Sequence, residues 1–178
     1  RSLRWLLSES VTRGARGLGT HGKGQSRYPY LKLLETLPSF HPGGRNALLI
    51  GRGGGFIVGA LHRHGIVTDT IEIDSKVAEA AQLHFDFEPP GELVIGDARY
   101  EIRRLDKTYD FIIHDCFTGG TVPSHLLSLE MLQELRAMLN EDGVLALNFV
   151  DFTQPEEARA VAAVHQTIGE VFAHQRTF

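Results

Sequence analysis

The 178-residue sequence contains a single cysteine, Cys116, and no apolar run that approaches the length of a membrane span. A lone cysteine excludes an internal disulfide and is typical of a reducing compartment. Lysine and arginine form no cluster, and a net charge of −4 gives no electrostatic case for binding nucleic acid. The N-terminus also lacks a signal-peptide pattern. These absences predict a cytoplasmic protein without a nucleic-acid partner.

The composition is that of an ordinary globular domain, with 42% hydrophobic and 22% charged residues. We expect residues 1–27 to form a short N-terminal β segment and a mobile, glycine-rich loop. Residues 28–178 are expected to form the main nucleoside-binding domain. The chain begins without Met and ends where a strand pattern starts, so we expect a piece of a longer protein whose last strands are missing here.

Residues 46–74 have the pattern of strand, glycine turn, helix and strand, which is the size of one βαβ unit. The turn contains Gly51, Gly53, Gly54 and Gly55. Glycines let the backbone approach a ligand closely, and the helix that follows presents unpaired N–H groups. Glu72 lies about twenty residues further on, where a carboxylate can accept hydrogen bonds from ribose hydroxyls. The pattern predicts a nucleoside-bearing cofactor.

Two alternatives to that reading stay open. Phe56 occupies the place of the third glycine in the dinucleotide fingerprint, which disfavours NAD. A glycine-rich turn that binds nothing is the other alternative, although such a density of glycines serves no packing purpose.

In the remaining sequence, predicted helices alternate with predicted strands. We predict helices at 30–37, 75–83, 98–105, 126–139 and from a Thr153/Glu156 capping box to about Phe172, and strands at 92–95, 109–114 and 144–150. This alternation predicts an α/β fold with a doubly wound, mainly parallel sheet. In such sheets ligands bind beyond the carboxyl ends of the strands.

Acidic residues follow several of these predicted strands. Asp97 suits recognition of an adenine edge, together with backbone N–H groups at Ala98, or it caps the helix that begins there. For Asp74 we favour helix capping. Asp115 follows a buried strand and either orients and deprotonates an amine nucleophile or holds the turn. We expect no metal site, because no set of His, Cys and acidic residues has metal-ligand spacing.

Two neighbours of Asp115 have simpler interpretations. We expect His114 to face the opposite side of the strand, as a core histidine satisfied by a hydrogen bond. Cys116 is expected to be a packing residue with no base beside it.

These residues resemble a family, the spermidine/spermine synthases (polyamine aminopropyltransferases), a branch of the S-adenosylmethionine-type Rossmann fold. The motifs are LLIGRGGGF, TIEIDSKVAEAA, VIGDAR, YDFIIHDCF followed by Pro123, and MLNEDGVLALNFV. The resemblance implies that the glycine motif holds the nucleoside, Glu72 binds ribose, Asp97 binds adenine and Asp115 activates the attacking amine.

Departures from the family concern the polyamine half of the site. Gly54 stands where an aspartate usually meets the aminopropyl amine, and Thr118 stands where an acid grips the diamine. Tyr28 followed by proline replaces a Tyr-His pair of the acceptor site. A dicationic diamine needs carboxylates to replace its hydration. The pattern is closer to divergent synthase-like domains that are fused to membrane segments.

Three functions follow from this resemblance. The leading one is aminopropyl transfer from decarboxylated S-adenosylmethionine to a small-molecule amine, without a metal. The alternative is an S-adenosylmethionine-dependent methyltransferase, for which Arg52 is the nearby cation that could meet an α-carboxylate. The third is a catalytically silent nucleoside-binding or assembly domain. The resemblance also implies a homodimer and, outside this chain, fusion to a membrane region.

Overall fold

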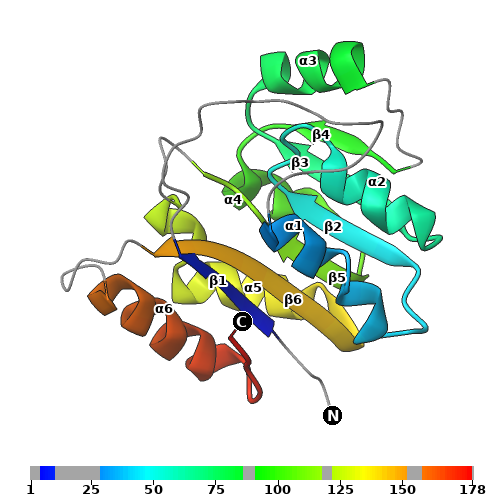
Figure 1. The fold of residues 1–178 in the computed structure, drawn as a ribbon. Helices are drawn as coiled ribbons and strands as arrows, with labels where there is room; N and C mark the ends of the chain where they lie inside the picture. Colours follow the sequence, from blue (N-terminus) through cyan, green and yellow to red (C-terminus); the bar gives the residue numbers. More distant parts are fainter. Residues whose placement is uncertain (1–4, 11–28, 86–90, 118–121, 152–157, 178) are drawn as a thin grey trace.

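The computed structural model describes residues 5–10, 29–85, 91–117, 122–151 and 158–177, which form a six-stranded sheet covered by helices (Figure 1). The strands are β1 (Trp5–Ser10), β2 (Asn46–Ile50), β3 (Val67–Glu72), β4 (Leu93–Ile95), β5 (Tyr109–His114) and β6 (Leu139–Asp151). The α-helices are α1 (Pro29–Leu34), α2 (Phe56–Arg63), α3 (Ser75–Phe85), α4 (Ala98–Glu101), α5 (Leu129–Ala137) and α6 (Ala158–Val171). Short 3-10 helices are η1 (Leu37–Ser39), η2 (Ile102–Arg104) and η3 (Ser124–Leu126).

The strand order is β1-β6-β5-β2-β3-β4, and every pair in it is parallel. Parallel neighbours require crossover connections, which the intervening helices supply. The order reverses between β5 and β2, so the crevice at their carboxyl ends is the expected ligand position in a doubly wound sheet. The predicted fold class is therefore confirmed, and the predicted N-terminal strand is β1.

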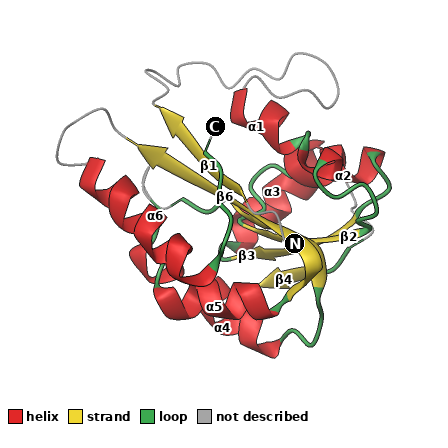
Figure 2. Cartoon of the chain, turned by 90° about the horizontal axis from the view of Figure 1, so that it is seen from below, coloured by secondary structure: helices red, strands yellow, loops and turns green. Residues whose placement is uncertain are grey.

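Helices cover both faces of the sheet (Figure 2), and a hydrophobic cluster lies beneath them on each face. Along β2, Ala47 and Leu49 pack with α1 and α2, whereas Leu48 and Ile50 belong to the layer under α5 and α6. Adjacent residues of a strand point to opposite faces, so a strand buried on both faces must be apolar throughout. This explains why the central strands read as continuous hydrophobic runs.

The structure corrects two element boundaries and confirms the favoured capping role of Asp74. Helix α5 begins at Leu129, where Ser128 accepts a hydrogen bond from the Met131 N–H, rather than at residue 126. Residues 140–143, which lie between the predicted helix and the predicted strand, belong to β6, whose pairing with β5 shifts register there. Helix α3 is capped by Asp74, whose side chain accepts from the Lys76 N–H at 2.8 Å.

Some predictions concern residues outside the described ranges. They are the Thr153/Glu156 capping box and the mobile loop within residues 1–27, so the division into two segments stays a prediction.

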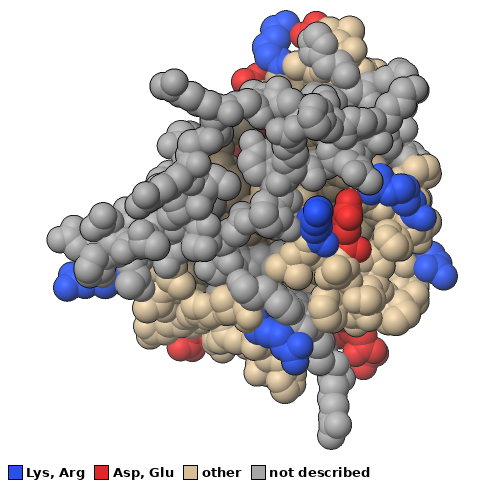
Figure 3. Space-filling model, in the orientation of Figure 1, with Lys and Arg blue, Asp and Glu red and all other residues tan. Residues whose placement is uncertain are grey.

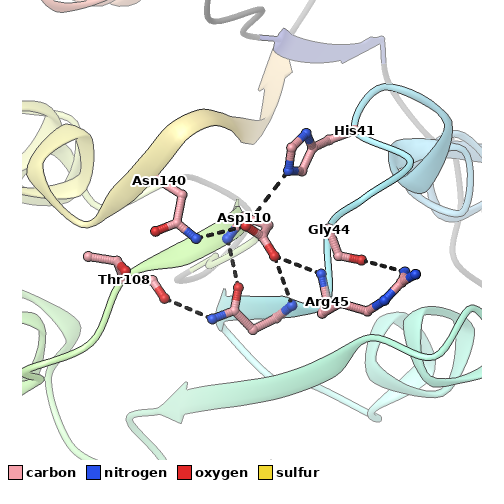
Figure 4. Close-up of polar contacts among 7 residues, drawn as sticks. His41, Gly44, Arg45, Thr108, Asp110 and Asn140 are labelled. Atoms are coloured by element: carbon pink, nitrogen blue, oxygen red, sulfur yellow. Dashed lines mark hydrogen bonds and ion pairs between the residues drawn. The ribbon is translucent and has the colours of Figure 1, made fainter.

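The amino-terminal edge of the sheet is fastened by Asp110 on β5 (Figure 4). Its carboxylate accepts hydrogen bonds from the Arg45 N–H at 2.7 Å, the Asn46 N–H at 3.3 Å and the Asn140 amide at 2.7 Å. His41 lies 3.7 Å away. Burial alone would raise the pKa of Asp110, but these hydrogen bonds hold it below its ordinary value. The carboxylate thus joins β2, β5 and the start of β6.

The described surface carries charges of both signs. On the face in Figure 3, Lys and Arg side chains are scattered among acidic ones rather than gathered in one patch. Within the described ranges, no helix has both the length and the apolar character needed to cross a membrane.

Candidate functional site

A cavity of about 870 Å³ lies at the carboxyl ends of β2, β3, β4 and β5. Seven of the predicted site residues line it: Gly51, Gly53, Gly54, Glu72, Asp97, Ala98 and Asp115. Gly55 lies just behind the lining and is the N-cap residue of α2. The parallel strands therefore bring together residues that are spread over more than sixty positions of the sequence, as the sheet topology predicts.

The glycine turn depends on its lack of side chains. Gly51, Gly53 and Gly55 have φ values of +89°, +50° and +78°, a region that favours glycine. A Cβ on Gly51 would also overlap the backbone carbonyl of Asp115. Glycine at this position lets the end of β2 approach the end of β5, which places the turn beside the predicted catalytic aspartate.

Glu72 is buried and holds the glycine turn through its carboxylate. Its Oε2 accepts hydrogen bonds from the N–H groups of Arg52 at 3.1 Å and Gly53 at 3.2 Å, and its Oε1 accepts from the Asp74 N–H at 3.1 Å. A carboxylate offers about four acceptor positions, so capacity for a ribose hydroxyl is left. The predicted ribose contact stays a prediction, and the carboxylate has a structural role beside it.

Asp97 caps the helix that follows it. Its Oδ1 accepts from the Arg99 N–H at 2.8 Å, which confirms the capping interpretation. Its Oδ2 lies 3.8 Å from Nε2 of His125, a cavity residue on η3 that the sequence reasoning did not single out. The adenine contact and the part of Ala98 in it stay predictions; both residues line the cavity.

Asp115 is oriented by an amide that the sequence analysis missed. The Asp115 N–H donates to the Ile50 carbonyl at 2.8 Å, and Oδ1 accepts from the side-chain amide of Asn148 at 2.8 Å. Asn148 is buried on β6. The signal was available, because an amide interrupts the apolar run VLALNFV. This hydrogen bond restricts the rotation of the Asp115 carboxylate, whose catalytic role stays a prediction.

The neighbours of Asp115 are held uncharged. His114 is fully buried, and its Nε2 lies 3.2 Å from the Leu126 carbonyl, which confirms the predicted core histidine. Burial lowers the pKa of His114 to about 4. Burial and then the charge of Asp115 raise the pKa of Cys116 to about 12. The sequence analysis was wrong that no base lies beside Cys116, because its Sγ is 3.6 Å from the His114 ring nitrogens. Both shifts nevertheless oppose a reactive thiolate.

Comparison with known proteins agrees with this geometry. The spermine/spermidine synthase domain family matches residues 29–178. The chain belongs to that family.

Two curated relatives have different activities. An N-terminal histidine N-methyltransferase of Emericella nidulans is 39% identical over 156 residues, which cover 83% of this chain and 27% of that protein. A polyamine aminopropyltransferase of Vibrio vulnificus is 35% identical over 131 residues, covering 68% of this chain and 43% of that protein. Both relatives are named as transferases. The chain spans less than half the length of either relative.

A probable spermidine synthase of Corynebacterium glutamicum has the same fold. It superposes with a TM-score of 0.74 at 18% sequence identity, over 85% of this chain and 57% of that one. At this level of identity the similarity establishes the fold alone.

The acids of the family's polyamine half are not found in the described part of the cavity. Its described lining contains three acids, Glu72, Asp97 and Asp115, and each already accepts a hydrogen bond from the protein. Gly54 adds no carboxylate to the glycine turn. Two predicted substrate residues, Tyr28 and Thr118, lie outside the described ranges, so their roles stay predictions.

The lining does contain one buried cation. Arg52 is 6% exposed, and its Nε is buried without a hydrogen-bond partner. For a metal, by contrast, the described residues contain no group of three or more His, Cys, Asp or Glu side chains placed to hold an ion.

Proposed function

We propose that this domain transfers the methyl group of S-adenosylmethionine to a nitrogen atom of its acceptor. The observation that carries the proposal is the makeup of the cavity wall at the glycine turn, where Gly54 provides no acid to meet the cationic amine of an aminopropyl tail. Removing an ammonium group from water without a carboxylate partner is costly, so a wall of this kind disfavours a doubly cationic substrate pair.

The chemistry requires little beyond positioning and a base. The acceptor nitrogen attacks the methyl carbon, the carbon–sulfur bond breaks, and its electron pair stays on sulfur to give S-adenosylhomocysteine. A proton then passes to Asp115 or to water, from the attacking nitrogen of an amine or from the other ring nitrogen of an imidazole. The sulfonium is an excellent leaving group, so correct alignment and a carboxylate held by Asn148 are sufficient for the reaction.

The acceptor we propose is an N-terminal histidine. The Emericella relative, which matches the larger share of this chain, is named for that substrate. An imidazole has a pKa of about 6.5 and is mostly uncharged at neutral pH, so it needs no array of carboxylates to replace hydration. That requirement suits a described lining with three acids that are already hydrogen-bonded.

A transfer assay tests the proposal. The protein is incubated with S-adenosylmethionine and a peptide that begins with histidine, and products are identified by mass spectrometry. We expect one added methyl group on that peptide, and none on a copy with a blocked amino terminus and alanine in place of the histidine. Absence of transfer to histidine-initiated peptides and to free amines would refute the proposal.

Aminopropyl transfer is the second candidate. The family match and the Vibrio relative support it, because the nucleoside half of the site serves either donor. Decarboxylated S-adenosylmethionine with putrescine or a longer diamine tests it in the same assay. Formation of an aminopropylated amine, with no methylated product from S-adenosylmethionine, would place this candidate first.

A further inference from the structure

We infer that Arg52 binds the α-carboxylate of the donor's amino-acid tail and thereby selects S-adenosylmethionine over its decarboxylated form. This inference rests on the proposed function, because only the intact methionine tail carries that carboxylate. Arg52 is a buried residue of the glycine turn, and it lines the same cavity as Glu72 and Asp115.

The buried charge of Arg52 has no counter-charge among the described residues. Arg52 is 6% exposed, and its Nε, fully removed from solvent, has no hydrogen-bond partner. No ion pair joins its guanidinium to any described acid, and the Glu72 carboxylate is engaged by the Arg52 backbone N–H instead. Buried charges in proteins are normally paired or hydrogen-bonded, because an unpaired one loses its hydration without compensation. The missing partner is therefore an anion.

The position of Arg52 in the cavity lining distinguishes it from the other described arginines. Other described arginines meet protein acceptors: Arg45 meets the Gly44 carbonyl, Arg63 meets Glu35, Arg99 meets Ser128, Arg103 meets Glu134 and Arg104 meets Glu101. Arg52 differs from these residues because it lies in the turn that borders the cavity. A nucleoside with its ribose near Glu72 and its sulfur near Asp115 would direct its tail past this turn.

A carboxylate is the anion that suits the guanidinium of Arg52. A planar guanidinium pairs with a carboxylate through two parallel hydrogen bonds. The methionine tail offers one carboxylate and one ammonium group, whereas the decarboxylated tail offers the ammonium alone. Arg52 would attract the first tail and repel the second, so a single residue can set the choice of donor.

Calorimetric titration with matched ligands tests this inference. S-adenosylhomocysteine, adenosylthiopropylamine, which lacks only the carboxylate, and methylthioadenosine, which lacks the charged tail, are each titrated into wild type, Arg52→Met and Arg52→Lys. We expect wild type to bind S-adenosylhomocysteine about 10- to 100-fold more tightly than adenosylthiopropylamine, the range of one charged hydrogen-bonded pair. Arg52→Met should abolish that preference and leave the affinity for methylthioadenosine unchanged.

Two controls make the result specific. Arg63→Gln removes an exposed arginine of α2 that does not line the cavity and should keep the preference. Arg52→Lys keeps the charge without the planar fork and should keep part of it, which also provides a test if Arg52→Met fails to fold. A wild-type protein without the preference, or an Arg52 variant that retains all of it, would overturn the inference.

The outcome is separable from that of the proposed function. A preference that depends on Arg52, found together with no methyl transfer to any nitrogen acceptor, would leave the carboxylate site standing and refute the reaction. Preference for adenosylthiopropylamine, found together with aminopropyl transfer, would overturn both.

Discussion

The two edges of the sheet use carboxylates in different ways. At the amino-terminal edge, Asp69 and Asp110 are surrounded by donors from the protein. At the carboxyl-terminal edge, Glu72, Asp97 and Asp115 border a cavity. All five acids lie in or directly after strands, so their positions in the sequence are similar. What distinguishes them is which groups occupy their oxygens.

Asp69 illustrates the structural edge. Its Oδ1 accepts from the Glu92 N–H at 2.8 Å, and its Oδ2 accepts from the Tyr109 hydroxyl and the Lys107 ammonium, both at 2.9 Å. Burial opposes ionisation of Asp69, yet these donors lower its pKa. Burial, and then the hydrogen bond to Asp69, raise the pKa of Tyr109. An acid enclosed in this way joins strands and is unavailable to a ligand. Acids of the other edge instead hold the walls of the cavity and face its interior.

Replacement of Asp115 by asparagine should give the largest effect. We expect transfer activity to fall by about 10²- to 10⁴-fold, the range of a lost general base, because the amide cannot accept a proton. Affinity for S-adenosylhomocysteine should change little, since Asp115 is predicted to act on the acceptor. The measurements are initial rates and calorimetry on both proteins. Equal rates would show that Asp115 only holds the turn.

His114, one residue before Asp115, should instead control stability. Its pKa of about 4 lies below the ordinary 6.5, so the unfolded chain takes up a proton first as the pH falls. The stabilisation is complete above about pH 6.5 and declines toward pH 4, with a loss of about 2 kcal/mol at pH 5. Urea unfolding at pH 7 and pH 5 measures it.

The matched variant for this measurement is His114→Asn, which should lose little stability between pH 7 and pH 5. Asp110, whose pKa is lowered, adds its own loss only below about pH 4, outside this window. A wild-type protein equally stable at both pH values would contradict the buried, uncharged histidine.

Asp110→Asn tests the amino-terminal edge directly. The NH₂ group of asparagine is itself a donor and would face the N–H donors of Arg45 and Asn46. We therefore expect a loss of about 2 kcal/mol in the free energy of unfolding. Ligand affinity should be unchanged. Asp106→Asn, at an exposed position four residues earlier, is the matched control and should alter neither quantity. Weakened ligand binding in a folded Asp110→Asn protein would break the distinction between the edges.

The smallest effect is expected for Lys107→Met. Its ammonium bonds to Asp69 and Glu92, but its side chain is 46% exposed, so solvent screens the pair. We expect a loss below about 1 kcal/mol, measurable by urea unfolding and reduced further by salt. A loss as large as that of Asp110→Asn would mean that Lys107 is an essential part of the edge.

The sequence was sufficient for the architecture and for the positions of most site residues. Apolar runs, glycines and helix periodicity predicted the parallel sheet, and Glu72, Asp97 and Asp115 do border one cavity. Residues 140–143 contain Asn, Asp and Gly, which favour turns locally, yet they lie within β6, at the place where its register with β5 shifts between Leu139 and Val144.

Contacts between residues far apart in the chain could not be predicted from the sequence, for a physical reason. Local patterns determine which segments become strands and which ends carry acids, since propensity and periodicity act over a few residues. Tertiary packing alone decided that Asn148 holds Asp115, that Glu72 holds the glycine turn and that the Arg52 Nε is buried with no hydrogen-bond partner among the described residues. Burial and the saturation of hydrogen bonds depend on every neighbour in space, and these neighbours come together only when the sheet has formed.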